Sequence, residues 1–204
     1  MSKNAAAAHR HSKDLKNGPD TIDFKSNTLK LFTESIQRRP EGKILDLGTA
    51  CSENIRFFTQ RVQKLYICDM VSRLAWSLYK KAPVHKIWQQ LDYPAKSFDG
   101  ILLWELADRL DERDVTTLAN LCHTMLKPGG LLLMFVLGEQ QASSVVNSFV
   151  IGQNFRIHLR PQPHLHLPLC TRQNRDVLAM MSAFTPVRSF VCRHGLREFL
   201  FKRD

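Results

Sequence analysis

The chain has 204 residues, of which 44% are hydrophobic and 24% are charged. These values exclude a wholly disordered or fibrous chain and fit one domain of ordinary size. The longest apolar run, Leu131 to Leu137, has seven residues, against ~18 for a membrane-spanning helix, so we expect no membrane partner. Lys and Arg exceed Asp and Glu by 29 to 19, which suits either nucleic acid as a partner or an ordinary solvated basic surface.

The basic surplus is uneven along the chain. Residues 1–20 carry four basic and two acidic side chains, and residues 151–204 carry nine basic and three acidic ones. This distribution predicts a mobile basic arm over 1–20 and a single domain over 21–204. The five cysteines are odd in number and include no Cys-x-x-Cys pair, a pattern typical of reduced thiols. We therefore expect a cytoplasmic protein.

Apolar runs of strand length are separated by helix-length segments over the first two thirds of the chain. Within each run apolar and polar residues do not alternate, which is typical of parallel strands covered on both faces. In chain order the pattern predicts a helix over 21–37, a strand over 43–48, a helix over 54–63, a strand over 64–69, a helix over 72–81, a weaker strand over 86–91, a strand over 98–104, a helix over 111–126 and a strand over 131–137.

The end of the chain has a different pattern. A helix is predicted over 172–184, followed by two strand-like runs, 186–193 and 196–203, joined across His194 and Gly195. Two such runs around a short turn are typical of a β-hairpin. The predicted fold class is therefore α/β, a three-layer αβα Rossmann-like sandwich whose mostly parallel sheet ends in an antiparallel C-terminal hairpin.

The first candidate ligand site is the turn that follows the strand predicted over 43–48. Here the sequence Leu47-Gly-Thr-Ala-Cys-Ser52 places small residues between a strand and a helix. Such a turn lets a ligand approach the backbone closely, and the helix N-terminus offers free N–H groups. The alternative is an ordinary tight turn, because only Gly48 is present where nucleotide-binding turns commonly have three glycines.

Asp69 is the second candidate, at the end of the next strand and 21 residues after Gly48. A carboxylate at this place in a dinucleotide-type fold accepts hydrogen bonds from the ribose hydroxyls. The alternative role of Asp69 is to cap the helix that begins near Ser72.

Together with Lys127-Pro-Gly-Gly130 and the terminal hairpin, these residues resemble the class I S-adenosylmethionine-dependent methyltransferases over residues 22–204. The resemblance implies a seven-stranded sheet with an antiparallel last strand, and S-adenosylmethionine as the cofactor. An NAD-binding Rossmann protein is the nearest rival. It requires Gly-x-Gly-x-x-Gly in the first turn, and Gly48 lacks those partners.

The resemblance also assigns roles to individual residues. It implies that Asp69 holds the ribose and that Met70 and Asp92 lie at the adenine. In the family's first motif, an acid precedes three glycines, and here alanine and serine replace the second and third of them. The residues implied to contact the cofactor are Asp46, Gly48, Ala50, Ser52, Asp69, Met70, Asp92 and Trp104.

The segment Leu103-Trp-Glu-Leu106 matches the end of the family's fourth strand, beside the methionine moiety and the methyl acceptor. The sulfonium methyl group is already activated, so the protein mainly supplies alignment. Glu105 is the candidate catalytic residue, either as a base or as a group that positions the acceptor. The alternative for Glu105 is a salt bridge with Arg109, four residues later. Trp104 is either a wall of the acceptor pocket or a core residue.

Residues 139–170 are predicted to form a substrate-side insertion or flap, with a Pro-rich connection over 160–170. A zinc site is the alternative, because His158, His164, His166 and Cys170 are near one another in the sequence. No second ligand pair stands at finger-like spacing, so we expect no metal. The histidines then face the acceptor.

These observations predict an S-adenosylmethionine-dependent methyltransferase that acts on an unidentified small molecule. No Asn/Asp-Pro-Pro-aromatic string follows the fourth strand and no Pro-Cys pair occurs, which argues against two common ways of methylating nucleobases. The basic residues of 151–204 are also divided between the two faces of the hairpin, whereas a phosphate-tracking groove needs them on one. The alternatives are a non-catalytic binding or regulatory protein of the same fold, and an RNA-directed methyltransferase.

Overall fold

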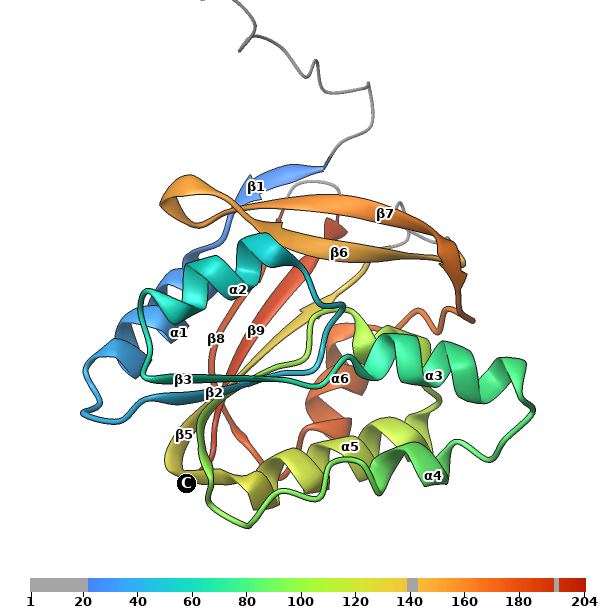
Figure 1. The fold of residues 1–204 in the computed structure, drawn as a ribbon, viewed down its shortest axis with the longest axis horizontal. Coiled ribbons are helices and arrows are strands. Elements are labelled where there is room, and N and C mark those ends of the chain that lie inside the picture. Colours follow the sequence, from blue (N-terminus) through green and yellow to red (C-terminus); the bar gives the residue numbers. More distant parts are fainter. Residues whose placement is uncertain (1–21, 139–142, 193–194) are drawn as a thin grey trace, which may run out of the picture.

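The computed structural model describes residues 22–138, 143–192 and 195–204, so the arm predicted over 1–20 lies outside the described residues. Figure 1 shows a central twisted sheet with helices on both sides and a smaller sheet across one end. The elements in chain order are β1 (Asp23–Lys25), α1 (Asn27–Gln37), β2 (Lys43–Asp46), α2 (Ser52–Thr59), β3 (Lys64–Ile67), α3 (Met70–Tyr79), α4 (His85–Trp88), β4 (Phe98–Leu102), the 3-10 turn η1 (Leu106–Arg109), α5 (Glu112–Met125), β5 (Leu126–Val136), β6 (Val145–Ile151), the 3-10 turn η3 (Gln153–Phe155), β7 (Arg156–His166), α6 (Asn174–Met180), β8 (Thr185–Val191) and β9 (Arg197–Lys202).

The main sheet has the strand order β3-β2-β4-β5-β9-β8. The pairs β2–β3, β2–β4 and β4–β5 are parallel, whereas β9 runs antiparallel to both of its neighbours, β5 and β8. Two apolar clusters lie on opposite faces of this sheet. One contains side chains of α3 to α6, and the other contains side chains of α1, α2 and the smaller sheet. The predicted αβα fold class with its antiparallel C-terminal hairpin is confirmed.

The strand predicted over 86–91 is wrong, and the described part of the main sheet therefore has six strands instead of the seven implied by the resemblance. Residues His85–Trp88 form the short helix α4. The buried apolar residues Ile87, Trp88 and Leu91 have the i, i+1, i+4 spacing of one helical face, and they pack into the core from there. The sheet ends at β3 on this side.

The helix predicted over 21–37 begins only at Asn27. Ser26 follows the strand β1 and caps α1. Its hydroxyl accepts a hydrogen bond from Leu29 N at 3.0 Å. A serine at this position satisfies one of the free N–H groups of the first helical turn. The preceding residues, Asp23–Lys25, pair antiparallel with β7.

The segment between β5 and α6 contains an antiparallel hairpin, β6–β7, that joins β1 in a three-stranded sheet of order β1-β7-β6. The Pro-rich segment predicted to be a connection over 160–170 is therefore a strand as far as His166. Figure 1 shows β6 and β7 crossing one end of the main sheet, close to α2. Among the described residues, no helix is long and apolar enough to cross a bilayer.

Candidate functional site

The turn after β2 is organised around the buried carboxylate of Asp46. Its Oδ1 atom accepts hydrogen bonds from Gly48 N at 3.0 Å and from the indole Nε1 of Trp104 at 2.7 Å. Burial raises the pKa of Asp46 to about 6, although both of these hydrogen bonds favour the charged form. Asp46 of the first motif and Trp104, two residues after β4, are thus held together at the carboxyl ends of the parallel strands.

Gly48 is required here by a close side-chain contact. A Cβ atom on this residue would lie 2.0 Å from Cδ1 of Trp104. The indole is 3% exposed and stacks on Phe135 with ring centroids 5.3 Å apart, and it also contacts Phe149 at 5.5 Å. Trp104 has φ 25°, a value that non-glycine residues rarely adopt and that marks stored strain. The indole therefore fills the space beside the first glycine.

Asp69 brings the two candidate motifs into contact. Its carboxylate caps α3, accepting from Ser72 N at 2.8 Å and from the Ser72 hydroxyl at 2.9 Å, so the helix-capping role is present. Oδ2 also accepts a hydrogen bond from Ala50 N at 3.3 Å. Asp69 is half-buried and Ala50 is exposed, so this contact lies at the surface. Ser52 is the first residue of α2.

The two residues expected at the adenine lie in different environments. Met70 is fully buried in the core, where its Sδ lies 3.6 Å from the Cys68 thiol. Asp92 is exposed, and it follows α4 and Leu91. The side chain of Met70 is therefore not accessible to an adenine ring in this structure, whereas Asp92 presents a solvated carboxylate.

Glu105 is buried, and its carboxylate is bonded on both oxygens. Arg109 Nη2 pairs with Oε1 at 3.3 Å, Asn147 N donates to Oε1 at 2.7 Å, and Asn147 Nδ2 donates to Oε2 at 3.2 Å. Burial raises the pKa of Glu105, while the charge of Arg109 opposes the increase. The ion pair with Arg109 that the spacing indicates is present. Through its two hydrogen bonds with Asn147, the carboxylate of Glu105 attaches β6 to the segment after β4.

Four further contacts attach the β6–β7 hairpin to the first turn and α2. The hydroxyls of Thr49 and Ser148 are 2.7 Å apart. The buried side chain of Asn54 donates to the carbonyl of Phe149 and accepts from Ile151 N, both at 2.8 Å. An ion pair also joins Glu53 and Arg160. Our sequence reasoning missed these partners, because the contacts span about a hundred residues and have no local signal.

Asp108 is a further buried acid, and the sequence analysis did not single it out. Leu137 N donates to its Oδ2 at 2.8 Å, and its Oδ1 has no hydrogen-bond partner among the described residues. Burial raises the pKa of Asp108 to about 7. The carboxyl group therefore titrates near neutral pH at the carboxyl end of β4.

The histidines of the 139–170 segment are distributed along β7. His158 Nδ1 lies 3.3 Å from Asp23, and the ring of His166 contacts Ser144 and the carbonyl of Pro163. In the described part of the chain, no three His, Cys, Asp or Glu side chains are grouped closely enough to hold a metal ion.

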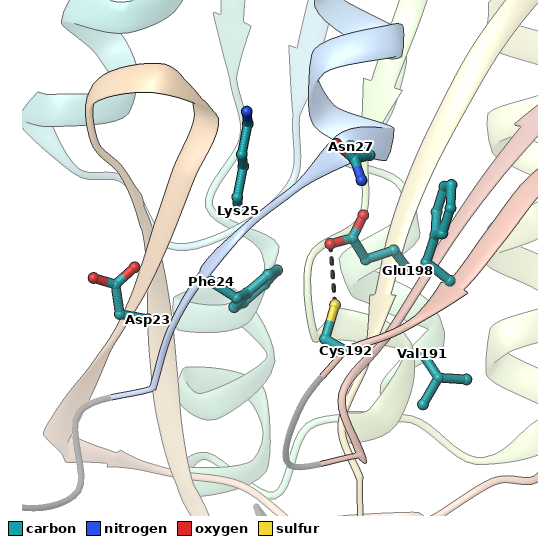
Figure 2. Close-up of a pocket in the computed structure, with 8 residues that line it drawn as sticks. Asp23, Phe24, Lys25, Asn27, Val191, Cys192 and Glu198 are labelled. Carbon is teal, nitrogen blue, oxygen red and sulfur yellow. Dashed lines mark hydrogen bonds between the residues drawn. The ribbon is translucent and has the colours of Figure 1, made fainter.

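A cavity of about 420 Å³ lies between β1 and the β8–β9 hairpin. Figure 2 shows the carboxylate of Glu198 beside Cys192, whose thiol donates to Oε1 at 3.2 Å. Burial and the charge of Glu198 raise the pKa of the Cys192 thiol, so this thiol stays protonated and is a poor nucleophile. None of the residues predicted to bind the cofactor lines this cavity.

Comparisons with solved structures agree on the fold. A methyltransferase from Clostridium acetobutylicum described as S-adenosylmethionine-dependent aligns with TM-score 0.56 and 12% identity over 85% of this chain and 91% of its own. The N-methyltransferase NodS from Bradyrhizobium japonicum, solved with S-adenosylhomocysteine, aligns with TM-score 0.53 and 16% identity over 86% and 83%. A 1,6-didemethyltoxoflavin-N1-methyltransferase from Burkholderia thailandensis aligns with TM-score 0.50 and 14% identity over 87% and 78%.

No protein-family model matches the chain, and a search of curated proteins finds no match. The structural comparisons show that the chain has the fold of the class I S-adenosylmethionine-dependent methyltransferases. The sequence identity, 12% to 16% in these three cases, is too low to carry their activities over.

Proposed function

We propose that the protein binds S-adenosylmethionine across the carboxyl ends of β2 and β3 and is a methyltransferase. The observation that carries this proposal is the contact between Asp69 Oδ2 and Ala50 N at 3.3 Å, which joins the two motifs that the fold uses for this cofactor. A hydrogen bond of this length at an exposed amide is weak, so a ribose hydroxyl can replace it. S-adenosylmethionine, when bound, supplies an activated methyl group.

The residues fit the adenosine half of the cofactor. Asp69 is half-buried, and the carboxylate of Asp92 is exposed. In this proposal the carboxylate of Asp69 accepts hydrogen bonds from the ribose hydroxyls while it continues to cap α3. The carboxylate of Asp92 lies at the adenine. The small side chain of Ala50 leaves the backbone of the turn accessible.

The methionine half does not fit the side chains as they stand. Trp104 fills the space beside Gly48, and both oxygens of Glu105 are bonded to other groups. Glu105 is thus better suited to positioning β6 than to removing a proton from an acceptor. These contacts favour a second candidate function, a non-catalytic protein of this fold that binds an adenosine-containing ligand.

We propose a small molecule as the methyl acceptor. The β6–β7 hairpin is attached beside the first turn and α2 through Thr49, Asn54 and Glu53, and a hairpin held there leaves less room for a polymer than for a compact acceptor.

Calorimetric titration with S-adenosylhomocysteine and with adenosine tests the proposal. We expect Asp69→Ala to bind S-adenosylhomocysteine ~10–100-fold more weakly, because the ribose hydroxyls lose their acceptor. Asp111→Ala is the matched control, since Asp111 also caps a helix, accepting from Asp114 N at 2.8 Å, and lies outside the site. Absence of binding by the wild-type protein would overturn the proposal.

The same titrations separate the two candidate functions. A methyltransferase holds the methionine half, so S-adenosylhomocysteine should bind more tightly than adenosine. Equal affinities would favour the non-catalytic protein. A methyl-release assay with pooled small metabolites and, separately, total RNA then tests the acceptor class. Turnover with RNA alone would contradict the small-molecule acceptor.

A further inference from the structure

The helices α3 and α4 present a strongly basic surface. Residues 70–91 contain four Lys and Arg residues and no Asp or Glu. Arg73, Lys80, Lys81 and Lys86 are all exposed. None of them forms an ion pair with a carboxylate of the described residues. The cations on this surface are therefore not neutralised by a carboxylate of the described residues.

Two large aromatic side chains stand on the same surface. Trp76 is 62% exposed and Tyr79 is 76% exposed. Their rings stack with centroids 5.8 Å apart and an interplanar angle of 30°. Scattered exposed apolar residues are ordinary, but a contiguous pair of this size marks an interaction site. The Lys80 ammonium lies 4.7 Å from the Trp76 centroid and 5.6 Å from that of Tyr79.

Trp76 borders a hollow of about 620 Å³ between α3 and α4, which is lined among others by Arg73, Lys80, Lys86 and Gln90. Figure 1 shows both helices at the edge of the molecule, α3 running outward from the main sheet. The hollow thus combines one exposed indole ring, three cations and one side-chain amide. This is the combination that binds bases by stacking and the backbone by charge.

We propose that this surface, the α3–α4 face, binds single-stranded nucleic acid. One base stacks on the Trp76–Tyr79 pair, and Lys80, Arg73 and Lys86 contact the neighbouring phosphates. A strand suits the surface better than a free nucleotide, because the rings are too exposed to enclose a small ligand and the cations extend along two helices. Duplex bases are already stacked on each other and offer no free face.

The proposal does not rest on the proposed function, although Ser72 both lines the hollow and contacts Asp69. Binding is therefore measured with saturating S-adenosylhomocysteine present, so that adenosine-like contacts at the cofactor site are blocked. The probe is a short fluorescein-labelled oligouridylate, followed by fluorescence anisotropy. A DNA strand of the same length, a duplex and free AMP are the competitors.

We expect Trp76→Ala to weaken oligouridylate binding ~tenfold, within the range for loss of one base-stacking contact. The double variant Lys80→Gln/Lys86→Gln should bind more weakly at low salt and lower the slope of log K against log salt by ~1.4, because each of the two phosphate contacts contributes ~0.7. Arg188→Gln, an exposed charge removed on β8, is the matched control and should leave the affinity unchanged. All these side chains are exposed, and circular dichroism checks the folding of each variant.

Three results would overturn the proposal. The first is a wild-type protein that does not bind oligouridylate, or an affinity that Trp76→Ala leaves unchanged. The second is competition by free AMP as effective as that of the strand, which would assign the surface to a nucleotide. The third is an oligomer of the wild-type protein that dissociates in Trp76→Ala while oligouridylate does not bind, which would assign the surface to a second copy of the chain.

Discussion

Replacing Gly48 by alanine tests the contact that shapes the first turn. The new Cβ would lie 2.0 Å from Cδ1 and 2.8 Å from Nε1 of Trp104, well inside an ordinary contact. The indole cannot easily withdraw, because Phe135 stacks on it and Asp46 holds its N–H. Overpacking of this kind costs ~3 kcal/mol, which corresponds to a fall of ~6–12 °C in the melting temperature for a domain of this size.

A double-mutant cycle isolates the contact. Trp104→Ala alone should cost ~3–5 kcal/mol through the cavity that it leaves. In that background Gly48→Ala should cost less than ~1 kcal/mol, since the Cβ then has room, and the coupling energy should be ~2 kcal/mol. Urea unfolding followed by far-UV circular dichroism measures all four proteins. An equal cost of Gly48→Ala with and without the indole would refute the reasoning.

Three further predictions concern Ala50, Asp108 and Glu105. Ala50→Leu should abolish S-adenosylhomocysteine binding while Ala50→Gly keeps it, because Ala50 is exposed at the turn over which the ligand passes. Calorimetry that shows unchanged affinity in Ala50→Leu would place the ligand elsewhere. Burial raises the folded-state pKa of Asp108 to about 7, above its ordinary value of 3.8. This carboxyl group should therefore lower the stability of the wild-type protein by up to ~4 kcal/mol as the pH rises from about 4 to 7. Urea unfolding of Asp108→Asn should depend less on pH, and an identical pH dependence in both proteins would exclude this titration. Glu105→Ala should lower the free energy of unfolding by ~3 kcal/mol, as expected when a buried ion pair is broken. The control Glu34→Ala, which breaks the exposed pair with Lys30, should lower it by less than ~0.5 kcal/mol. Equal losses of stability would show that the Glu105 contacts do not anchor β6.

Local signals predicted the elements of the main sheet. The apolar runs at β2, β3 and β4 and the caps and periodicity of α5 depend on neighbours within a few residues. Asp111 caps α5 at the start of the helix predicted over 111–126, and its carboxylate accepts a hydrogen bond from Asp114 N. The terminal hairpin β8–β9 also closes over a short turn. In each case the signal that identifies the element, an apolar run, a helix cap or a short turn, lies within a few residues, so the sequence pattern contains it.

The smaller sheet and the Trp104 contact could not be predicted in this way. The β1–β7 pairing joins Asp23 to His158, 135 residues apart, and nothing in the three residues of β1 identifies that partner. Gly48 seemed to serve a ligand, because a glycine turn after a strand commonly does. Its actual neighbour is an indole 56 residues later, which only the packing of β4 against β2 brings close.

A crystal structure of the protein grown with saturating S-adenosylhomocysteine tests the central proposal most directly. We predict that the ribose hydroxyls replace Ala50 N as hydrogen-bond donors to the carboxylate of Asp69. A ligand bound elsewhere, or a complex in which Asp69 keeps its hydrogen bond to Ala50 N, would contradict the proposal.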